Sequence, residues 1–161
     1  MSIIDEINNM QIKSLAKTIA VTAHFGQADK LGKDYILHPF AVEQLLVTPT
    51  TEESVVAFLH DTIEDTNLTL NFFRHFLWKG GGGSVFSDKI TNALDAITKR
   101  KGETNQQYWL RVKQNPIALK VKLADIKHNT SPERMDGLPE VERLRLQEKY
   151  KEALKTLVGG K

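Results

Sequence analysis

The feature that most constrains this chain is an apolar run that ends in a cluster of ionisable residues, AFLHDTIEDT at positions 57–66. On a helix, His60 and Glu64 share one face, and so do Asp61 and Asp65, because residues four apart are one turn apart. An imidazole and three carboxylates crowded together are costly to desolvate unless a cation sits among them. Imidazole nitrogens with carboxylate oxygens suit a divalent transition metal better than calcium. This stretch therefore predicts a metal site whose remaining ligands lie elsewhere in the chain.

Length and composition narrow the class of protein. A chain of 161 residues fits one domain, expected over residues 1–158 with a disordered tail at 159–161, and the absence of cysteine excludes disulfides and thiolate zinc sites. A cysteine-free chain suits a reducing cytosol, so we expect a cytoplasmic protein. No apolar run approaches the roughly 18–20 residues of a membrane span, and no signal-peptide pattern opens the chain. The formal charge of +2, with acids and bases interspersed, gives little support for a nucleic-acid partner.

Hydrophobic residues recur at helical spacing along most of the chain, and no strand-like alternation or internal repeat stands out. A capping box of Thr50 and Glu53 opens the helix that ends in the ionisable cluster. The pattern predicts an all-α fold, a single helical bundle. The expected helices cover residues 5–25, 39–47, 55–64, 70–78, 87–97, 104–114, 116–128 and 140–157. Loops are expected at 24–38, 80–83, 99–102 and 131–139.

The other candidate ligands come from the five histidines and from one aspartate. His75 lies among aromatic residues without a carboxylate nearby, which favours a core or surface role. His24 and His128 fit helix capping, or support of a site, better than metal binding. His38 precedes a proline at a helix start, a fixed backbone position from which a ring can point into a cleft. Asp125 follows an amphipathic run and, taken alone, fits a solvated acid or a helix-terminal residue equally well.

Three segments, taken together and in order, resemble the HD-domain metal phosphohydrolases, and most closely the stand-alone small alarmone hydrolases. These are related to the hydrolase half of the bifunctional alarmone synthetase–hydrolases. The segments are AHFGQADKLGKDYILHP at 23–39, AFLHDTIEDT at 57–66 and VKLADIKHNT at 121–130. The similarity extends over roughly residues 16–150.

The resemblance implies a set of site residues. A single catalytic metal, usually manganese, is held in the family by the positions of His38, His60, Asp61 and Asp125. The pair that follows the HD dipeptide positions or activates the attacking water. In this chain that pair is Glu64 and Asp65.

Substrate contacts follow from the same resemblance. Asn129 occupies a substrate-contacting position, and Lys30 and Tyr35 fall in the substrate loop of the family. Lys122 is a further candidate, because its charge would neutralise a polyphosphate.

One departure concerns the loop, where many relatives carry an arginine–lysine pair and this chain carries Asp29 and Lys30. A carboxylate cannot contact a pyrophosphate as a guanidinium does. Leu31 also replaces a small polar residue, so base recognition is expected to differ. On sequence alone, Asp29→Arg is therefore expected to improve KM for ppGpp.

The expected function is metal-dependent hydrolysis of a nucleotide, with removal of the 3′-pyrophosphate from (p)ppGpp or (p)ppApp. One alternative is an HD phosphohydrolase for another nucleotide, such as a nucleoside monophosphate or a dNTP. A second alternative is a catalytically idle alarmone-binding module. The expected partner is a small nucleotide, with neither nucleic acid nor membrane, and the sequence gives no oligomeric state.

Overall fold

The computed structural model describes residues 2–79 and 83–159, and within them every regular element is an α-helix. An isolated antiparallel bridge joins Ala28 and Asp34. The predicted all-α bundle is confirmed. None of the helices in the described ranges combines the length and the apolar character needed to cross a membrane. The helices are α1 (Ile3–Ala23), α2 (Leu37–Gln44), α3 (Thr51–Leu59), α4 (Thr62–Asp65), α5 (Leu70–Lys79), α6 (Gly83–Ile97), α7 (Asn105–Gln114), α8 (Pro116–Asn129), α9 (Pro132–Asp136) and α10 (Glu140–Val158).

Several helices begin at residues whose side chains cap the first turn, a pattern that can be recognised in the sequence. The predicted capping box is confirmed, since the Thr50 hydroxyl accepts from the Glu53 amide at 3.2 Å and the Glu53 carboxylate accepts from the Thr50 amide at 2.9 Å. Thr104 with Gln107 forms the same motif before α7. The Asn115 side chain caps α8 ahead of a proline at its first turn. These caps satisfy amide groups that would otherwise lack partners at each helix start.

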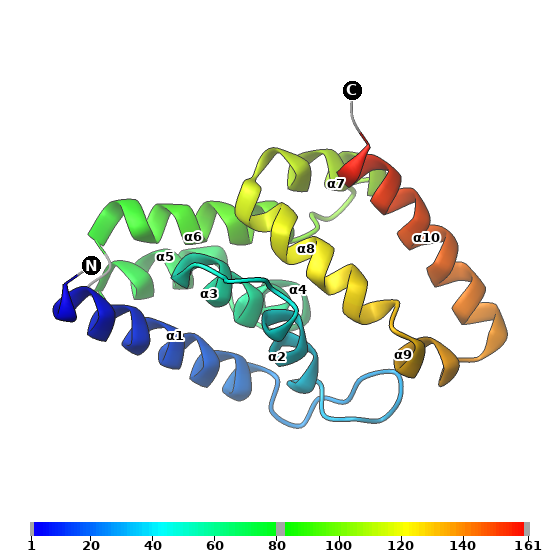
Figure 1. The fold of residues 1–161 in the computed structure, drawn as a ribbon, viewed down its shortest axis with the longest axis horizontal. Helices are drawn as coiled ribbons and strands as arrows, with labels where there is room; N and C mark the ends of the chain where they lie inside the picture. Colours follow the sequence, from blue (N-terminus) through cyan, green and yellow to red (C-terminus); the bar gives the residue numbers. More distant parts are fainter. Residues whose placement is uncertain (1, 80–82, 160–161) are drawn as a thin grey trace.

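Helix α3 lies at the centre of the bundle, with α1, α2, α6 and α8 packed around it (Figure 1). From Ser54 to Leu59 every residue of α3 is buried, as a helix surrounded on all sides requires. The Phe58 ring meets Phe40 of α2 edge-on, with ring centroids 5.6 Å apart. The buried centre holds α3 in place, and α3 delivers His60 and Asp61 at its C-terminal end.

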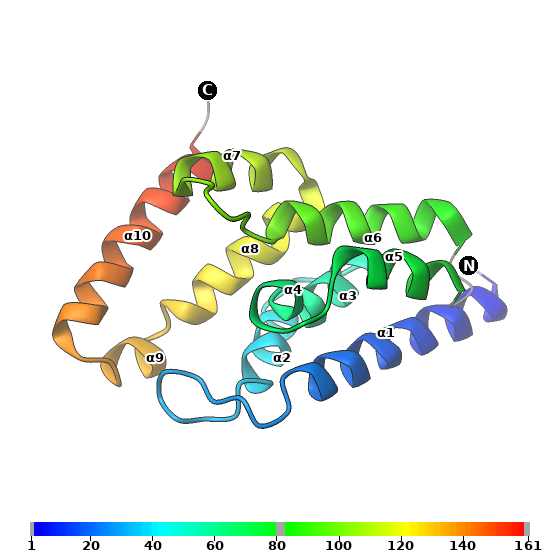
Figure 2. The same cartoon turned by 180° about the vertical axis from the view of Figure 1, so that it is seen from behind.

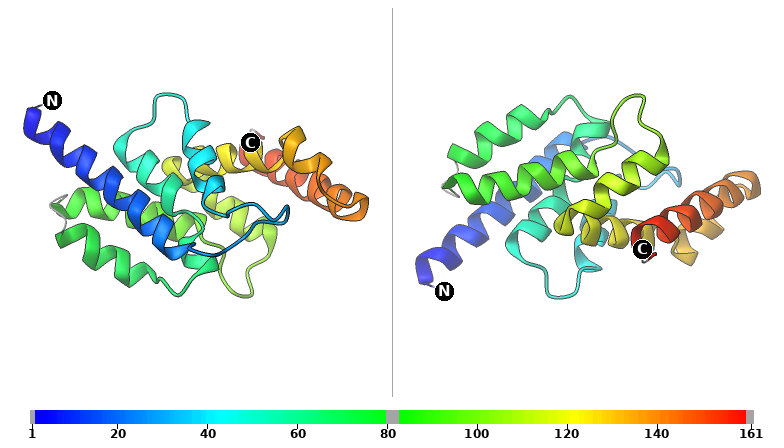
Figure 3. Two further views of the ribbon diagram at one scale, coloured as in Figure 1. Left: turned by 90° about the horizontal axis from the view of Figure 1, so that it is seen from below. Right: turned by 90° about the horizontal axis from the view of Figure 1, so that it is seen from above.

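The remaining helices extend the bundle in two directions. Helices α5 and α6 pack against each other beside α1, and α10 packs chiefly on α7 (Figure 2). The N-terminus of α1 and the turn from α9 into α10 lie at opposite ends of the molecule (Figure 3). The loop of residues 24–36 passes beside α9 in Figures 1 and 2, and Asp29 pairs there with Arg134.

Two predicted helices differ from the observed ones near the centre. The helix expected at 55–64 begins at Thr51 and is interrupted after Leu59, and the short α4 resumes at Thr62. The helix expected from Pro39 begins two residues earlier, at Leu37. Pro39 is still within the first turn, where a proline costs no hydrogen bond.

Four further predictions differ from the structure or fall largely outside the described ranges. The helix expected from Ser87 begins at Gly83, and Ser87 is buried within it. The loop expected at 131–139 contains α9, because Pro132 at its first position favours a helix start. The glycine loop expected at 80–83 and the tail expected at 159–161 lie outside the described residues, except for Gly83 and Gly159.

Candidate metal centre and its pocket

Three of the predicted ligands converge from separate helices. His38 is on the first turn of α2, His60 follows the last residue of α3, and Asp125 is on α8. All three are buried, and their ligand atoms lie within 4.8 Å of one another. The His38 Nε2 atom lies 3.2 Å from the Asp125 carboxylate. Residues nearly ninety positions apart in sequence therefore meet at one point.

The fourth predicted ligand, Asp61, borders the same point. Its Oδ2 atom lies 3.1 Å from the His60 Nε2 and 3.4 Å from the His38 Nε2. Its side chain keeps more solvent exposure than that of Asp125. The four residues thus form one cluster of two imidazoles and two carboxylates.

The orientation of both imidazoles directs their Nε2 atoms into the cluster. The His60 Nδ1 lies 2.8 Å from the Ala57 carbonyl, which can only accept, so Nδ1 carries the proton. The His60 Nε2 is buried without a hydrogen-bond partner among the described residues. The His38 Nδ1 lies 2.7 Å from the Nδ1 of His128, which leaves the His38 Nε2 facing the carboxylates. Metal-binding histidines are commonly fixed in this way through their other nitrogen.

The electrostatics of the cluster demand positive charge. Burial works to lower the pKa of His38, but hydrogen bonds to Asp125 and Asp61 raise it to about 9. Burial opposes ionisation of Asp61 too, yet the charge of His60 holds the pKa of Asp61 well below its usual range. Protonated imidazoles or a divalent cation would each supply this charge. Two imidazole nitrogens and two carboxylates form a donor set that fits a divalent transition metal.

Asp125 is held from both sides by its own helix. The Lys122 ammonium lies 2.7 Å from Oδ2, and the Asn129 amide donates to Oδ1 at 2.5 Å. These residues lie one turn before and one turn after Asp125 on α8. Burial alone would raise the pKa of Asp125, but the Lys122 charge lowers it. Both residues were predicted to contact substrate, and the structure places them on Asp125 while they also line the pocket.

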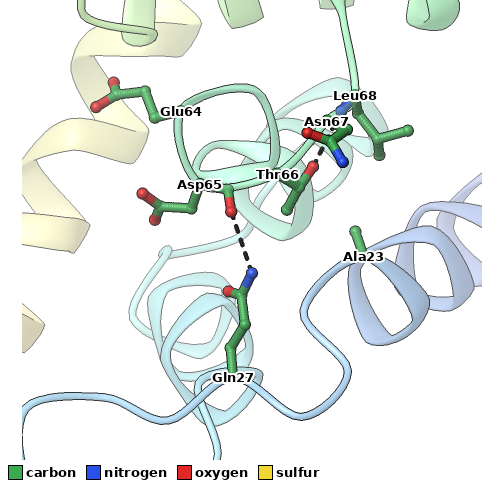
Figure 4. A pocket seen from close by; sticks show the side chains of 7 residues that line it. All are labelled: Ala23, Gln27, Glu64, Asp65, Thr66, Asn67 and Leu68. Carbon is green, nitrogen blue, oxygen red and sulfur yellow. Dashed lines mark hydrogen bonds between the residues drawn. The ribbon is translucent and has the colours of Figure 1, made fainter.

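Glu64 and Asp65, the predicted catalytic pair, both project from α4 to one side of that helix (Figure 4). The Asp65 carboxylate accepts from the Tyr35 hydroxyl at 2.9 Å, and the same hydroxyl lies 2.6 Å from Asp61. Gln27 donates to the Asp65 carbonyl at 3.1 Å, which ties the loop to α4 (Figure 4). Glu64 accepts from the Lys99 amide at 2.5 Å. The predicted pair therefore lies beside the cluster, although the continuous helix assumed for it is interrupted.

A pocket of about 420 Å³ opens over this cluster. His38, Asp61 and Asp125 lie in its wall together with both carboxylates of α4, while the opposite wall comes from the loop, α9 and α10. A second, more open hollow of about 560 Å³ borders Glu64 and Asp65 from the α1 side (Figure 4). The basic residues that line the first pocket are Lys30, Lys122, Arg134, Arg145 and Lys149. Acidic and basic groups thus share one cavity, as binding of a metal together with an anion requires.

The loop residue Asp29 does not behave as the sequence suggested. Its side chain is only 4 % exposed and pairs with Arg134 at 2.9 Å. The Asp29 Oδ1 accepts from the amides of Leu31 and Lys33 at 2.9 and 3.0 Å. The Asp29 charge is therefore neutralised within the protein by Arg134, a partner that sequence reasoning did not foresee. The Leu31 side chain packs against Gly137, where an added Cβ would lie 2.8 Å from it.

The contribution of α10 to the pocket was missed by sequence reasoning. Arg145, Leu146, Lys149 and Tyr150 all line the cavity, and Leu146 and Tyr150 are buried there. In sequence, the strongly charged last helix resembles a solvated surface helix. The signal that was present is its helical spacing, since 145, 146, 149 and 150 fall on one face.

No protein-family model matches the chain, but it is similar to several known proteins. It is 30% identical to a probable GTP pyrophosphokinase of Mycobacterium leprae over 132 residues, which are 75% of this chain and 16% of the relative. It is 31% identical to a GTP pyrophosphokinase of Streptomyces coelicolor over 125 residues, which are 71% and 14% of the two chains. It is 28% identical to a probable guanosine-3′,5′-bis(diphosphate) 3′-pyrophosphohydrolase of Synechocystis over 123 residues, or 68% and 15%.

These relatives are named as enzymes that act on guanine nucleotides. The stretches matched in these three cover 14 to 16% of the length of each relative. Two of the names describe pyrophosphate transfer to GTP, and one describes hydrolysis. The chain is therefore similar to a short part of enzymes named for pyrophosphate transfer to GTP or for hydrolysis of guanosine-3′,5′-bis(diphosphate).

Proposed function

We propose that this protein is a metal-dependent phosphohydrolase that removes the 3′-pyrophosphate from (p)ppGpp or (p)ppApp. The observation that carries the proposal is the convergence of His38, His60 and Asp125 within 4.8 Å, with Asp61 beside them. Donors of this type, facing a pocket lined with cations, suit a metal together with a phosphate-bearing substrate. We propose on the same grounds that the chain is an HD-domain protein, that it binds a metal and that it acts by hydrolysis.

His38, His60, Asp61 and Asp125 would hold the cation, with manganese as the expected ion. When bound, it would supply Lewis acidity at a phosphate oxygen and a lowered pKa for water. Lys122 and Asn129 keep the Asp125 carboxylate turned into the cluster.

Glu64 and Asp65 are the proposed proton acceptors for the attacking water. Burial raises the pKa of Glu64 above that of an ordinary carboxyl group, which suits a general base. Burial and the neighbouring carboxylates raise the pKa of Tyr35, so its hydroxyl stays protonated and donates to Asp61 or Asp65. Tyr35 thereby fixes the spacing between a proposed ligand and a proposed base.

The direction of the reaction is inferred from the site. GTP pyrophosphokinases and a 3′-pyrophosphohydrolase are both among the similar proteins, at 28 to 31% identity. Two carboxylates beside a four-residue imidazole–carboxylate cluster are the parts that water activation needs. Hydrolysis is therefore favoured over pyrophosphate transfer.

The test is a product assay with a defined metal. The protein, stripped with EDTA and supplied with Mn²⁺, is incubated with ppGpp, ppApp, dGTP and GMP, and the products are identified by ³¹P NMR. We expect ppGpp or ppApp to give pyrophosphate and the 5′-diphosphate. A parallel incubation with ATP and GTP tests synthesis, and formation of pppGpp and AMP there would contradict the proposal.

Variants separate chemistry from metal binding. Glu64→Gln and Asp65→Asn should each reduce kcat by roughly 10²–10⁴-fold, the usual contribution of a general base, with Mn²⁺ affinity retained. Glu148→Gln, on the exposed surface of α10, is the matched carboxylate control. Near wild-type rates in both α4 variants would remove the water-activating role.

The second candidate is an HD phosphohydrolase of another nucleotide. The loop favours this second candidate, because Asp29 occupies the position of an arginine and is itself paired with Arg134. Release of phosphate from GMP, or of triphosphate from dGTP, in the same assay would select this candidate. Metal-dependent binding of ppGpp without any product would select the alarmone-binding module.

A further inference from the structure

The cations that line the pocket differ in whether the protein itself supplies their counter-ions. Lys122 is paired with Asp125 at 2.7 Å, and Arg134 with Asp29 at 2.9 Å. Lys30 and Arg145 both pair with Glu142, which Arg145 contacts at 2.8 Å through two nitrogens. Lys149 lines the same pocket, yet no carboxylate of residues 2–79 or 83–159 lies within ion-pair distance of it. It is the cation whose counter-ion the described protein does not provide.

The surroundings of Lys149 make this lack of a partner unfavourable. Lys149 is half-buried, and it lies one turn after Arg145 on the pocket face of α10, where like charges repel. Its ammonium lies 5.4 Å from the centre of the Tyr150 ring, which offers only weak compensation. Burial lowers the pKa of Lys149, and the nearby charge of Lys122 lowers it further. A buried cation without a partner is a destabilising feature unless something outside the chain pairs with it.

We propose that Lys149 is a substrate-binding residue whose counter-ion is a phosphoryl group of the bound nucleotide. The other pocket cations already have carboxylate partners, so an entering phosphate must compete with Asp125, Asp29 or Glu142 for them. Lys149 offers its ammonium without such competition. The inference rests on the proposed function for the identity of the nucleotide, and on the pocket alone for the phosphate.

The experiment compares Lys149→Met, which keeps the length of the side chain, with Lys149→Arg, which keeps its charge. Lys151→Gln is the matched control, because Lys151 is on the same helix, is 77 % exposed and is absent from the pocket wall. Four quantities are measured: pyrophosphate affinity by calorimetry in metal-free buffer, KM and kcat for ppGpp with Mn²⁺, and the Tm.

The expected results differ from those of a structural lysine. Lys149→Met should bind pyrophosphate about tenfold more weakly, the loss expected for one charge-assisted contact, and should raise KM more than it lowers kcat. Its Tm should be equal to or higher than that of the wild type, because a half-buried charge without a carboxylate partner has been removed. Lys149→Arg should retain most of the affinity, and Lys151→Gln should match the wild type throughout.

Several results would contradict the substrate-binding role of Lys149. Unchanged pyrophosphate affinity in Lys149→Met, or no binding by the wild type, overturns the inference. A lower Tm with unchanged affinity assigns Lys149 a packing role, which also overturns it, and Lys149→Gln replaces Lys149→Met if the latter does not fold. If the wild type cleaves no alarmone but Lys149→Met still weakens pyrophosphate binding, the proposed function fails and this inference stands.

Discussion

Single side chains in this site are oriented by neighbours that are not among the four proposed ligands. His38 is oriented by His128 through a contact of 2.7 Å between their Nδ1 atoms. Burial, followed by the charge of His38, lowers the pKa of His128 to about 4, so His128 is neutral and can accept the proton. Sequence reasoning left His128 open between helix capping and support of a site, and this contact places it beside His38. A residue one turn from Asp125 thus acts on another proposed ligand.

The ion pair of Asp29 with Arg134 reverses the effect on KM that the sequence suggested for Asp29→Arg. Asp29→Arg would place a second guanidinium against Arg134 and remove the acceptor for the amides of Leu31 and Lys33. We expect KM for ppGpp to rise by about tenfold and the Tm to fall, since the variant breaks a partly buried ion pair and brings two like charges together. Steady-state kinetics and thermal melts at fixed ionic strength measure both effects. A lower KM would restore the original expectation from sequence.

The four proposed ligands could be named from sequence because the segments around HP, HD and VKLAD resemble those of a known family. Their convergence could not be derived from periodicity, because it depends on how α2, α3 and α8 cross. The partners of Lys122, Asn129 and Asp29 are likewise set by tertiary contacts. A charged residue on a helix looks the same in sequence whether its partner is water, a carboxylate or a ligand.

Among the elements, α6 and α7 meet at a junction where one arginine makes most of the side-chain hydrogen bonds. Arg111 of α7 donates to the carbonyls of Asp95, Ala96 and Thr98 at the end of α6. It also donates to Glu103 at 2.6 and 2.9 Å. Carbonyls at a helix C-terminus need such donors, and the planar guanidinium reaches several of them at once. The junction thereby fixes Lys99, whose amide donates to Glu64.

This junction predicts a pH-dependent contribution to stability. The hydrogen bond from Arg111 lowers the pKa of Glu103 from 4.5 to about 2. A lowered carboxyl pKa stabilises the fold fully above the unfolded value, and that stability is lost as the pH falls through the folded value. Glu103→Gln should lower the Tm by roughly 2–4 °C at pH 7. The deficit relative to wild type should shrink between about pH 4.5 and 2 in thermal melts, and a deficit that is constant over this range would refute the ion pair.

The presence of most helices could be predicted from sequence, whereas the break between α3 and α4 and the start of α6 could not. The capping boxes and apolar spacing located most helices to within a few residues. The interruption after Leu59 was not visible, because His60 and Asp61 fit a helical pattern as well as a turn. The early start of α6 was missed because Ser87 resembles a cap, and its burial inside the helix is decided by packing.

For the whole molecule, the cluster connects elements that are far apart in the chain. A cation held by α2, the end of α3 and α8 would bind the folded state and not the unfolded chain. Mn²⁺ at about 100 times its Kd should therefore stabilise the protein by about 2.7 kcal/mol, and EDTA should reverse the gain. His38→Ala should abolish this shift, whereas His75→Ala, on the exposed side of α5, should preserve it. A Tm that does not respond to Mn²⁺ in the wild type would contradict a metal centre.

Helix α10 forms one wall of the pocket, and its C-terminal end makes stronger contacts with the rest of the protein than its N-terminal end does. Its C-terminal end is tied to α7, where Lys113 donates to the carbonyls of Thr156 and Gly159 at 2.9 and 2.6 Å. Near its N-terminus, Val141 and Leu144 are exposed, and the contact with the loop is the ion pair of Glu142 with Lys30. Surface ion pairs contribute little to stability. The first turns of α10 should therefore open locally at a lower free energy than its C-terminal end, which leaves that side of the pocket wall free to move while the other side stays anchored.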